Sequence, residues 1–279
     1  MAKISKTRRK LAIATWAPPA DGTIFGKLTL DVTDAMEFIK EQRERTGTKV
    51  TIIHLVGKAA GNALAAAPTL NGKILFGRFV PFDSVDVTFL VALEGGQNLG
   101  KVKINNTDEK SVSEIATELR AAADKLNSGK DPAWEKSKGA LKVMPVFLLR
   151  PMIRITGWLA SALGVNIPAL GVEKHAFGSC IITSVGMLGF DEGYAPFTPF
   201  ARVPILLLVG AVRDRPDVVD GEVVVRKKIT VTATVDHRFI DGFQLGTLAT
   251  EFQRVIEHPF ENLVEGEFHK QIESEAVAE

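Results

Sequence analysis

The most restrictive feature of this chain is a polar motif that directly follows a strand-like run near its C-terminal end. Residues 229–235 alternate between apolar residues and threonine, which is the period of a half-buried β-strand. The next seven residues read Asp-His-Arg-Phe-Ile-Asp-Gly, so that His237 is expected at the strand end. Residues 243–256 then have the apolar spacing of a helix. A motif between a strand and a helix can hold an imidazole rigidly and still expose it to a substrate.

The residue types of the motif suggest a division of labour. A neutral imidazole at His237 can accept a proton from a thiol or hydroxyl, because the ordinary pKa of histidine lies close to neutral pH. Asp241, four residues on and followed by a glycine, can fold back to brace the backbone or Arg238, which makes it a support and not the base. A bare His-x-x-x-Asp pattern is more often a plain surface turn. The complete seven-residue string is far more specific.

That string resembles the signature of the catalytic domain of dihydrolipoamide acyltransferases, the core components of 2-oxo acid dehydrogenase complexes. The similarity runs weakly from about residue 26 to about residue 259. It implies the fold of chloramphenicol acetyltransferase, an α/β fold with a mixed β-sheet flanked by helices. It also implies that His237 is the general base, and that a serine or threonine from an earlier segment hydrogen-bonds the oxyanion of the tetrahedral intermediate.

A second segment carries the candidate for that hydroxyl. Residues 181–186 read Ile-Ile-Thr-Ser-Val-Gly and resemble the family segments Ile-Ser-Asn-Leu-Gly and Ile-Thr-Asn-Ile-Gly. Matching the glycines assigns the oxyanion contact to Thr183, a contact worth about 3 kcal/mol when preorganised. Ser184 then stands where the family often has asparagine, and we take Ser184 and Arg238 as candidate substrate-binding residues. On residue type alone, a polar pair at a strand end is the simpler interpretation.

Composition excludes several other classes of protein. With 46% hydrophobic and 24% charged residues, the chain is typical of a soluble globular protein. A formal net charge of +1 gives no electrostatic argument for a nucleic-acid partner. The single cysteine, Cys180, excludes an internal disulfide and a cysteine cluster for zinc, and we expect it to be buried and inert in an apolar strand. No signal peptide is visible and a lone cysteine suits a reducing compartment, so we expect a cytoplasmic protein. We expect no metal.

The resemblance divides the chain into an N-terminal arm over 1–25, a catalytic domain over 26–260 and a polar C-terminal tail over 261–279. Within the domain, about 139–177 is an apolar insertion relative to the family pattern. Three interpretations stay open for its core, residues 141–172: a helical hairpin packed on the domain or on a neighbouring subunit, a membrane-surface or partner-docking element, and a transmembrane helix. The hairpin is favoured, because the glycines, an asparagine and a proline in 155–172 interrupt any clean span.

Other elements follow from periodicity and end signals. We expect a strand at 26–32, a helix at 35–45 capped by Asp34, and a helix at 51–67 in which His54 packs or caps. Further along, we expect a helix from Ser111 or Ser113 to about Ser128, and a strand buried on both faces at 205–212. Two other segments, 73–79 and 85–93, are strand-like. Residues 214–221 are expected to form a turn-rich connection to a short strand at 222–226.

The leading hypothesis is an acyl-CoA-dependent acyltransferase that acts as a homotrimer. Coenzyme A is then a substrate, the acceptor is a thiol such as dihydrolipoamide, Thr183 comes from the adjoining subunit and Asp241 holds the His237 loop. Only about 25 residues precede the resemblance, so a lipoyl group is expected from a carrier on another chain. The polar tail has no apolar anchor, which favours a trimer over a larger cage.

Two other hypotheses belong to different classes. A catalytically lapsed trimeric scaffold could use the insertion to dock a partner or a membrane. A small-molecule acetyltransferase of the chloramphenicol type is less favoured, because that branch usually has a second histidine where this chain has Asp236.

Overall fold

A computed structural model describes residues 22–93, 98–132, 146–198 and 200–263. Its main sheet has seven strands in the order β1-β9-β7-β6-β4-β5, with β8 paired to the outer part of β9. The strands are β1 (Thr23–Asp31), β4 (Val87–Leu93), β5 (Asn98–Ile104), β6 (Cys180–Ser184), β7 (Ile205–Val209), β8 (Arg213–Val219) and β9 (Glu222–Asp236). Two pairs, β4 with β6 and β6 with β7, are parallel and the others are antiparallel. This mixed sheet confirms the fold class expected from the sequence.

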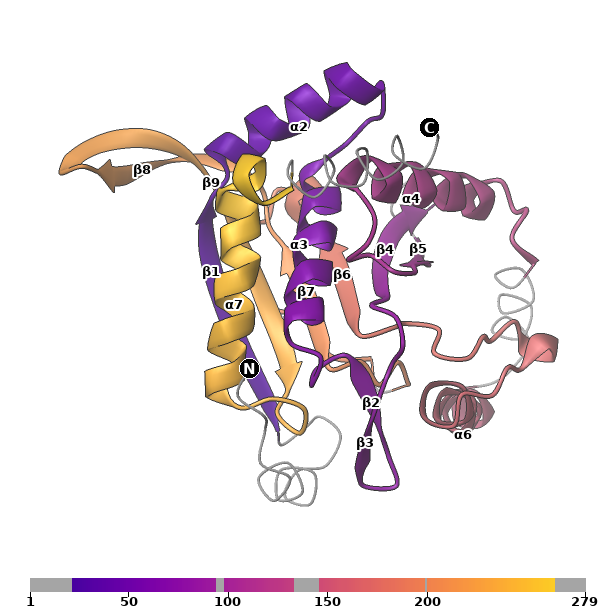
Figure 1. Ribbon diagram of the computed structural model, residues 1–279. Helices are drawn as coiled ribbons and strands as arrows, with labels where there is room; N and C mark the ends of the chain where they lie inside the picture. Colours follow the sequence, from indigo (N-terminus) through magenta and orange to yellow (C-terminus); the bar gives the residue numbers. More distant parts are fainter. Residues whose placement is uncertain (1–21, 94–97, 133–145, 199, 264–279) are drawn as a thin grey trace, which may run out of the picture.

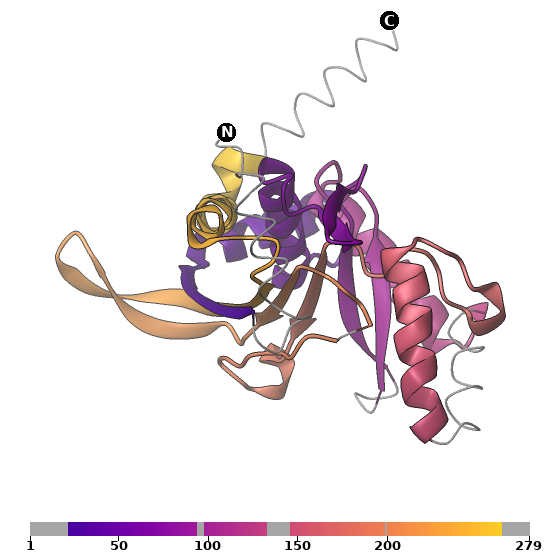
Figure 2. The same ribbon diagram turned by 90° about the horizontal axis from the view of Figure 1, so that it is seen from below.

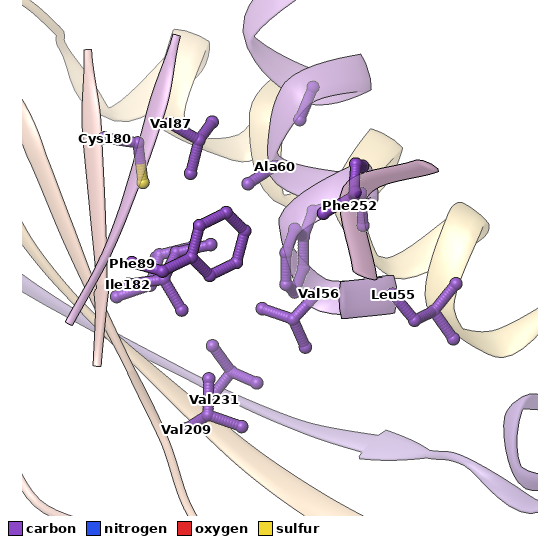
Figure 3. Close-up of a cluster of buried hydrophobic side chains, with 14 of the residues drawn as sticks. Leu55, Val56, Ala60, Val87, Phe89, Cys180, Ile182, Val209, Val231 and Phe252 are labelled. Carbon is purple, nitrogen blue, oxygen red and sulfur yellow. The ribbon is translucent and has the colours of Figure 1, made fainter. Parts of the chain in front are cut away.

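Helices cover one face of the sheet (Figure 1). They are α2 (Thr33–Thr46), α3 (Ile52–Ala66), α4 (Val112–Asn127) and α7 (Gly242–Glu257). Side chains from the four helices and from β1, β4, β5, β6, β7 and β9 pack together in the core between the two layers, and Figure 3 shows part of this core. Helix α3 approaches β4 so closely that a methyl group at Gly57 would collide with the Phe89 ring. This packing explains why the apolar stripe of 51–67 predicted a helix correctly.

Turn chemistry accounts for most of the differences from expectation. Asp34 lies in the first turn of α2, but the residue that holds the helix start is Asp31, whose Oδ1 accepts hydrogen bonds from the Thr33 amide at 2.9 Å and hydroxyl at 2.7 Å. The prediction that Asp34 caps this helix is therefore wrong. Residues 73–79 do not form one strand, because the chain reverses at Phe76 and Gly77, both with positive φ, between β2 (Gly72–Leu75) and β3 (Arg78–Pro81).

The expected turn-rich connection at 214–221 is also wrong. Residues 213–219 form β8, which pairs with β9 and projects as a long hairpin from the body (Figures 1 and 2). Pro216 is tolerated because β8 is an edge strand and needs no amide hydrogen on its outer side. The two strands expected at 222–226 and 229–235 are accordingly one continuous strand, β9.

Within the apolar insertion, the structure describes residues 146–177. Helix α6 (Val146–Gly157) is followed by a π-helical turn, Trp158–Ala162, and then by a loop that returns to β6. These residues contain one long helix, which corresponds to one of the two helices of the expected hairpin. Helix α6 lies beside the β5 end of the sheet, away from the β8–β9 hairpin (Figure 2). No helix in the described ranges is long and apolar enough to cross a bilayer.

Candidate active site

The loop that carries His237 is organised by a buried ion pair. Asp236 is 4% exposed, and its carboxylate accepts hydrogen bonds from the Arg238 Nε at 2.9 and 3.1 Å and from Nη2 at 2.5 Å. The same carboxylate also accepts the Arg238 amide at 3.0 Å. Charge-assisted, multiply bonded pairs of this kind fix both partners. His237 lies between them, so its backbone is held by residues on both sides.

Backbone contacts fix the loop further. The His237 amide donates to the carbonyl oxygen of Gly22 at 2.7 Å, and the Asp236 amide donates to that of Pro204 at 2.9 Å. Phe239 and Ile240 are 3% and 2% exposed and anchor the loop in the core. The His237 side chain itself is half-buried. A rigid backbone with a partly accessible imidazole is the arrangement that a general base requires.

Asp241 begins helix α7. Its Oδ1 accepts the Gln244 amide at 3.2 Å, and the Gln244 side chain accepts the Asp241 amide at 3.2 Å, which makes a reciprocal capping box. The carboxylate that forms the ion pair with Arg238 is that of Asp236. Asp241 therefore sets where α7 starts, directly after the His237 loop, and its part in holding that loop stays a prediction.

A pocket of about 330 Å³ lies next to this loop. Arg238 and Phe239 line it, together with Arg202 and the turn between β2 and β3. Burial and the nearby Arg238 guanidinium lower the pKa of Arg202. Two guanidinium groups around one pocket favour an anionic ligand. The sequence analysis missed Arg202, because it lies 36 positions from Arg238 and only the fold brings the two together.

The hydroxyl candidates lie at the C-terminal end of β6. Ile182 belongs to the core under the helices, whereas Ile181 belongs to the second apolar cluster on the opposite face of the sheet. Because side chains alternate along a strand, Thr183 shares the face of Ile181 and Ser184 shares the face of Ile182. Both residues are half-buried, and neither side chain makes a hydrogen bond within the described ranges. Only one of these hydroxyls can therefore serve a site on a given face.

Strand register separates Thr183 from His237 within one chain. Thr183 pairs with Leu208, and Leu208 pairs with Thr232, so that these three residues form one row across the sheet. His237 lies five residues further along β9 than Thr232, about 16 Å at the usual rise of a strand. A single chain does not bring the two candidate residues together. Any site that uses both needs two copies of the chain.

Two other residues behave as the sequence suggested. Nδ1 of His54 accepts the Thr51 amide at 3.0 Å at the start of α3, and burial together with Arg43 lowers the pKa of His54 to about 4. It is a packed capping histidine. Cys180 is 1% exposed, and burial raises the pKa of its thiol, so the expectation that it is buried is confirmed. A thiol in this environment is a poor nucleophile.

Comparison with known proteins now decides the family. The model of the family described as 2-oxoacid dehydrogenases acyltransferase (catalytic domain) matches residues 24–143 and 169–264. The chain belongs to this family. The resemblance seen in the His237 motif is thereby confirmed. The matched ranges leave out residues 144–168, which contain helix α6 and the π-helical turn.

Curated members of the acyltransferase family are similar at low identity. The chain is 22% identical over 237 residues to the dihydrolipoyllysine-residue acetyltransferase component of the pyruvate dehydrogenase complex of Zymomonas mobilis, covering 83% of this chain and 44% of that protein. It is 24% identical over 266 residues to the mitochondrial dihydrolipoyllysine-residue succinyltransferase component of the 2-oxoglutarate dehydrogenase complex of Saccharomyces cerevisiae, covering 92% and 48%. The chain thus spans about half the length of these relatives.

Solved structures agree with the fold of the acyltransferase family. A probable dihydrolipoamide acetyltransferase from Listeria monocytogenes superposes with a TM-score of 0.63 at 18% identity, covering 92% of this chain and 94% of that chain. Dihydrolipoamide acetyltransferase from Azotobacter vinelandii gives a TM-score of 0.62 at 18% identity, covering 92% of both chains. A chloramphenicol acetyltransferase gives 0.52 at 13% identity, covering 92% and 100%. The expected chloramphenicol acetyltransferase-like fold is confirmed.

Proposed function

We propose that this chain is an acyltransferase that moves an acyl group between coenzyme A and a thiol acceptor such as dihydrolipoamide. The observation that carries the proposal is the His237 loop, in which a buried ion pair and two backbone anchors hold a half-buried imidazole in the family's signature motif. Curated relatives are named as acetyltransferase and succinyltransferase components of 2-oxo acid dehydrogenase complexes, which supports the reaction class.

In this mechanism His237 accepts the proton of the attacking thiol, and the resulting thiolate attacks the thioester carbonyl. Thr183 of an adjoining subunit donates a hydrogen bond to the oxyanion of the tetrahedral intermediate. Collapse of that intermediate expels the second thiolate, which takes the proton back from His237. A study of the Azotobacter acetyltransferase addressed a serine, a histidine and an asparagine four residues beyond that histidine. That spacing supports a role for Asp241, although this chain has an aspartate there.

The pocket beside His237 supports an anionic substrate. Arg202 and Arg238 both line it, and coenzyme A carries phosphate groups that arginine binds well. We propose that Arg202 is the more available of the two, because the Arg238 guanidinium already bonds Asp236. The acyl carrier, a lipoyl protein, and the homotrimeric assembly are part of the same proposal. Ser184 is a weaker candidate, because it faces the opposite side of β6 from Thr183.

Transfer from acetyl-CoA to free dihydrolipoamide tests the proposal. His237→Ala should lower kcat by on the order of a thousandfold, the usual contribution of a positioned general base. His258→Ala is the matched control, because His258 is an exposed histidine at the other end of α7 and should leave the rate unchanged. If wild type neither transfers an acyl group nor binds coenzyme A, the catalytic proposal fails and a scaffold role is favoured.

The proposed oxyanion contact of the Thr183 hydroxyl is tested separately. Thr183→Val keeps the shape of the side chain and removes the donor, so kcat should fall about a hundredfold or more, while Thr183→Ser should retain most of the activity. Equal losses in both variants would contradict the oxyanion role.

A further inference from the structure

A second cavity lies at the β5 edge of the sheet, where its lining runs from Leu126 of helix α4 to Leu90 and Ile181 on the Thr183 face. Its volume is about 640 Å³, within the range of small-molecule sites. The sheet side is formed by Leu90, Ile181 and the side chains of β5, and the opposite wall by Met152 and Ile153 of helix α6. That helix lies in the residues that the family model does not match. The cavity is therefore built partly from a segment outside the shared family pattern.

Strand register places this cavity beside Thr183. Phe89 of β4 pairs with Ile182, and extending this register by one residue brings Leu90 beside Thr183. Leu90 in turn pairs with Lys101 of β5. Thr183, Leu90 and Lys101 thus form one row on one face, and the last two line the cavity. Neighbouring strands are about 4.8 Å apart, so the cavity begins about one strand away from the hydroxyl of Thr183.

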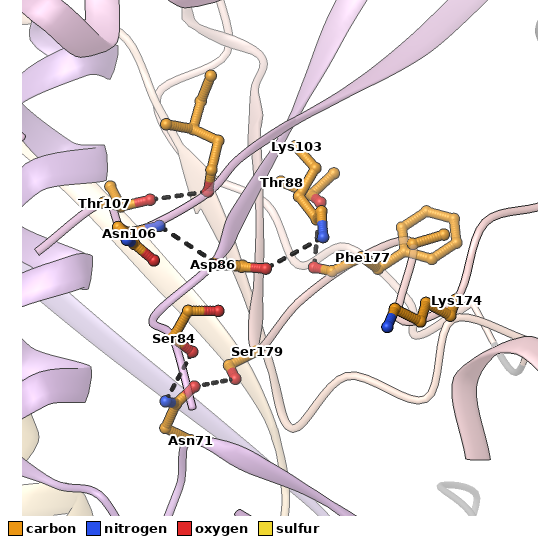
Figure 4. Close-up of polar contacts among 12 residues, drawn as sticks. Asn71, Ser84, Asp86, Thr88, Lys103, Asn106, Thr107, Lys174, Phe177 and Ser179 are labelled. Carbon is orange, nitrogen blue, oxygen red and sulfur yellow. Dashed lines mark hydrogen bonds and ion pairs between the residues drawn. The ribbon is translucent and has the colours of Figure 1, made fainter. Parts of the chain in front are cut away.

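The cavity wall on the side of the returning loop is fixed by polar contacts. The hydroxyl of Thr88 donates to the Phe177 carbonyl at 3.0 Å, and Ser179 donates to Asn71 at 2.5 Å (Figure 4). Lys103, which also lines the cavity, is paired with Asp86 at 3.0 Å in the same network. The loop that closes the cavity is therefore held to β4 through Thr88 and to the start of β2 through Asn71, which gives the cavity a defined shape.

Charges inside the cavity are already balanced by the chain. The Lys101 ammonium donates to the Ala176 carbonyl at 3.1 Å and lies 5.1 Å from the centre of the Phe177 ring. Burial lowers the pKa of Lys101, and Glu173 and Asp131, which also line the cavity, oppose that effect. A cation held in this way offers no excess charge to an anionic ligand. The remaining lining is dominated by aliphatic and aromatic side chains, which favours a neutral apolar occupant.

We propose that this cavity holds the acyl chain of the thioester, and that the preferred substrate carries an uncharged apolar acyl group several carbons longer than acetyl. The inference rests on the proposed function, because it takes Thr183 as the residue that binds the thioester carbonyl oxygen. The tetrahedral carbon carries the oxyanion, two sulfur atoms and the acyl chain. The oxyanion bonds Thr183, and the attacking sulfur faces His237 of another subunit. The acyl chain is then directed along the Thr183 face, where the cavity begins.

Acyl-chain selectivity tests the inference, with dihydrolipoamide held constant and acetyl-, hexanoyl- and succinyl-CoA compared. Wild type should give a higher kcat/KM with hexanoyl-CoA than with the other two. Ile153→Trp, which fills the cavity, should lower kcat/KM for hexanoyl-CoA tenfold or more and change acetyl transfer less than about twofold. The milder Ile153→Phe should give a smaller loss. Ile155→Trp is the matched control, because Ile155 lies on the same helix and is 57% exposed.

Binding of hexyl-CoA, an unreactive thioether, separates this inference from catalysis. Calorimetry should show that wild type and Ile155→Trp bind hexyl-CoA at least tenfold more tightly than coenzyme A, and that Ile153→Trp loses this preference. If hexyl-CoA binding depends on the cavity but no acyl group is transferred, the proposed catalytic function is overturned and the inference that the cavity holds the acyl chain is upheld. If the protein transfers acetyl groups but shows no preference for longer acyl chains, only the inference about the cavity is overturned and the proposed function stands. Equal losses of acetyl and hexanoyl transfer in Ile153→Trp would indicate that the cavity binds the acceptor. This result would also overturn the inference that the cavity holds the acyl chain.

Discussion

At the scale of single residues, the buried pair of Asp236 and Arg238 fixes the backbone on both sides of His237, the proposed general base. The sequence motif made His237 the candidate base, because the string around it is specific. The structure adds a contact that the sequence analysis did not propose, because Asp236 is bonded to Arg238 by side chain and backbone, while the supporting role of Asp241 stays a prediction. Both carboxylates lie close to Arg238 in sequence. Only burial distinguishes them, and burial depends on the complete sheet.

Removing one member of this pair should be costly. Asp236→Asn leaves the largely buried Arg238 guanidinium without its counter-ion, and loss of one partner of a buried pair typically costs about 3–5 kcal/mol. We expect a fall in the free energy of unfolding of on the order of 3 kcal/mol, measured by urea denaturation at fixed protein concentration, with a parallel loss of kcat. Lys27→Gln is the control, because it breaks the exposed pair with Glu192, which is worth less than about 1 kcal/mol. Equal stability of the two variants would contradict this reading of the loop.

At the scale of elements, helices were predicted better than strands. Helices α3, α4 and α7 combine an apolar stripe with local end signals, and both signals lie within the segment itself. The β8–β9 hairpin was missed because its polar alternation faces solvent and its stability comes from pairing between strands, which a local pattern does not report. The cavity behind α6 was missed for the same reason, since its walls come from segments far apart in the sequence.

The start of helix α3 gives a prediction about pH. Protonating His54 would remove the acceptor of the Thr51 amide and place a cation near Arg43 and the positive end of the helix dipole. Since folding lowers the pKa from 6.5 to about 4, the unfolded chain binds more protons between these values, and stability is lost as pH falls through this window. The contribution lost between pH 7.5 and 5 is about 2 kcal/mol.

His54→Gln isolates this effect, because glutamine at the same position can still accept the Thr51 amide and does not titrate between pH 5 and 7.5. The variant should match wild type in urea denaturation at pH 7.5 within about 1 kcal/mol, and should lose about 2 kcal/mol less on acidification to pH 5. Parallel pH profiles for the two proteins would exclude His54 as the titrating group.

At the scale of the whole molecule, the main consequence of the fold is that the two proposed catalytic residues are separated within one chain. His237 lies beyond the end of β9, and Thr183 lies in a row of the sheet about 16 Å away along the strands. The sequence resemblance predicted a shared site, and the register explains physically why a shared site is necessary if both residues act. Assembly is then part of the catalytic mechanism, because each interface must pair one chain's imidazole with its neighbour's hydroxyl.

This geometry predicts complementation between two inactive variants. His237→Ala and Thr183→Val each remove one half of every site, so each homo-oligomer should be inactive or nearly so. Co-expression in equal amounts gives mixed rings in which about one quarter of the interfaces, by random assembly, pair an intact His237 with an intact Thr183. Transfer to dihydrolipoamide should therefore recover to about one quarter of the wild-type rate. Co-expression of His237→Ala with a double variant that lacks both groups should recover none. Without recovery in the first pair, a shared site is excluded, and Thr183 acts in some other way than on the intermediate that His237 helps to form.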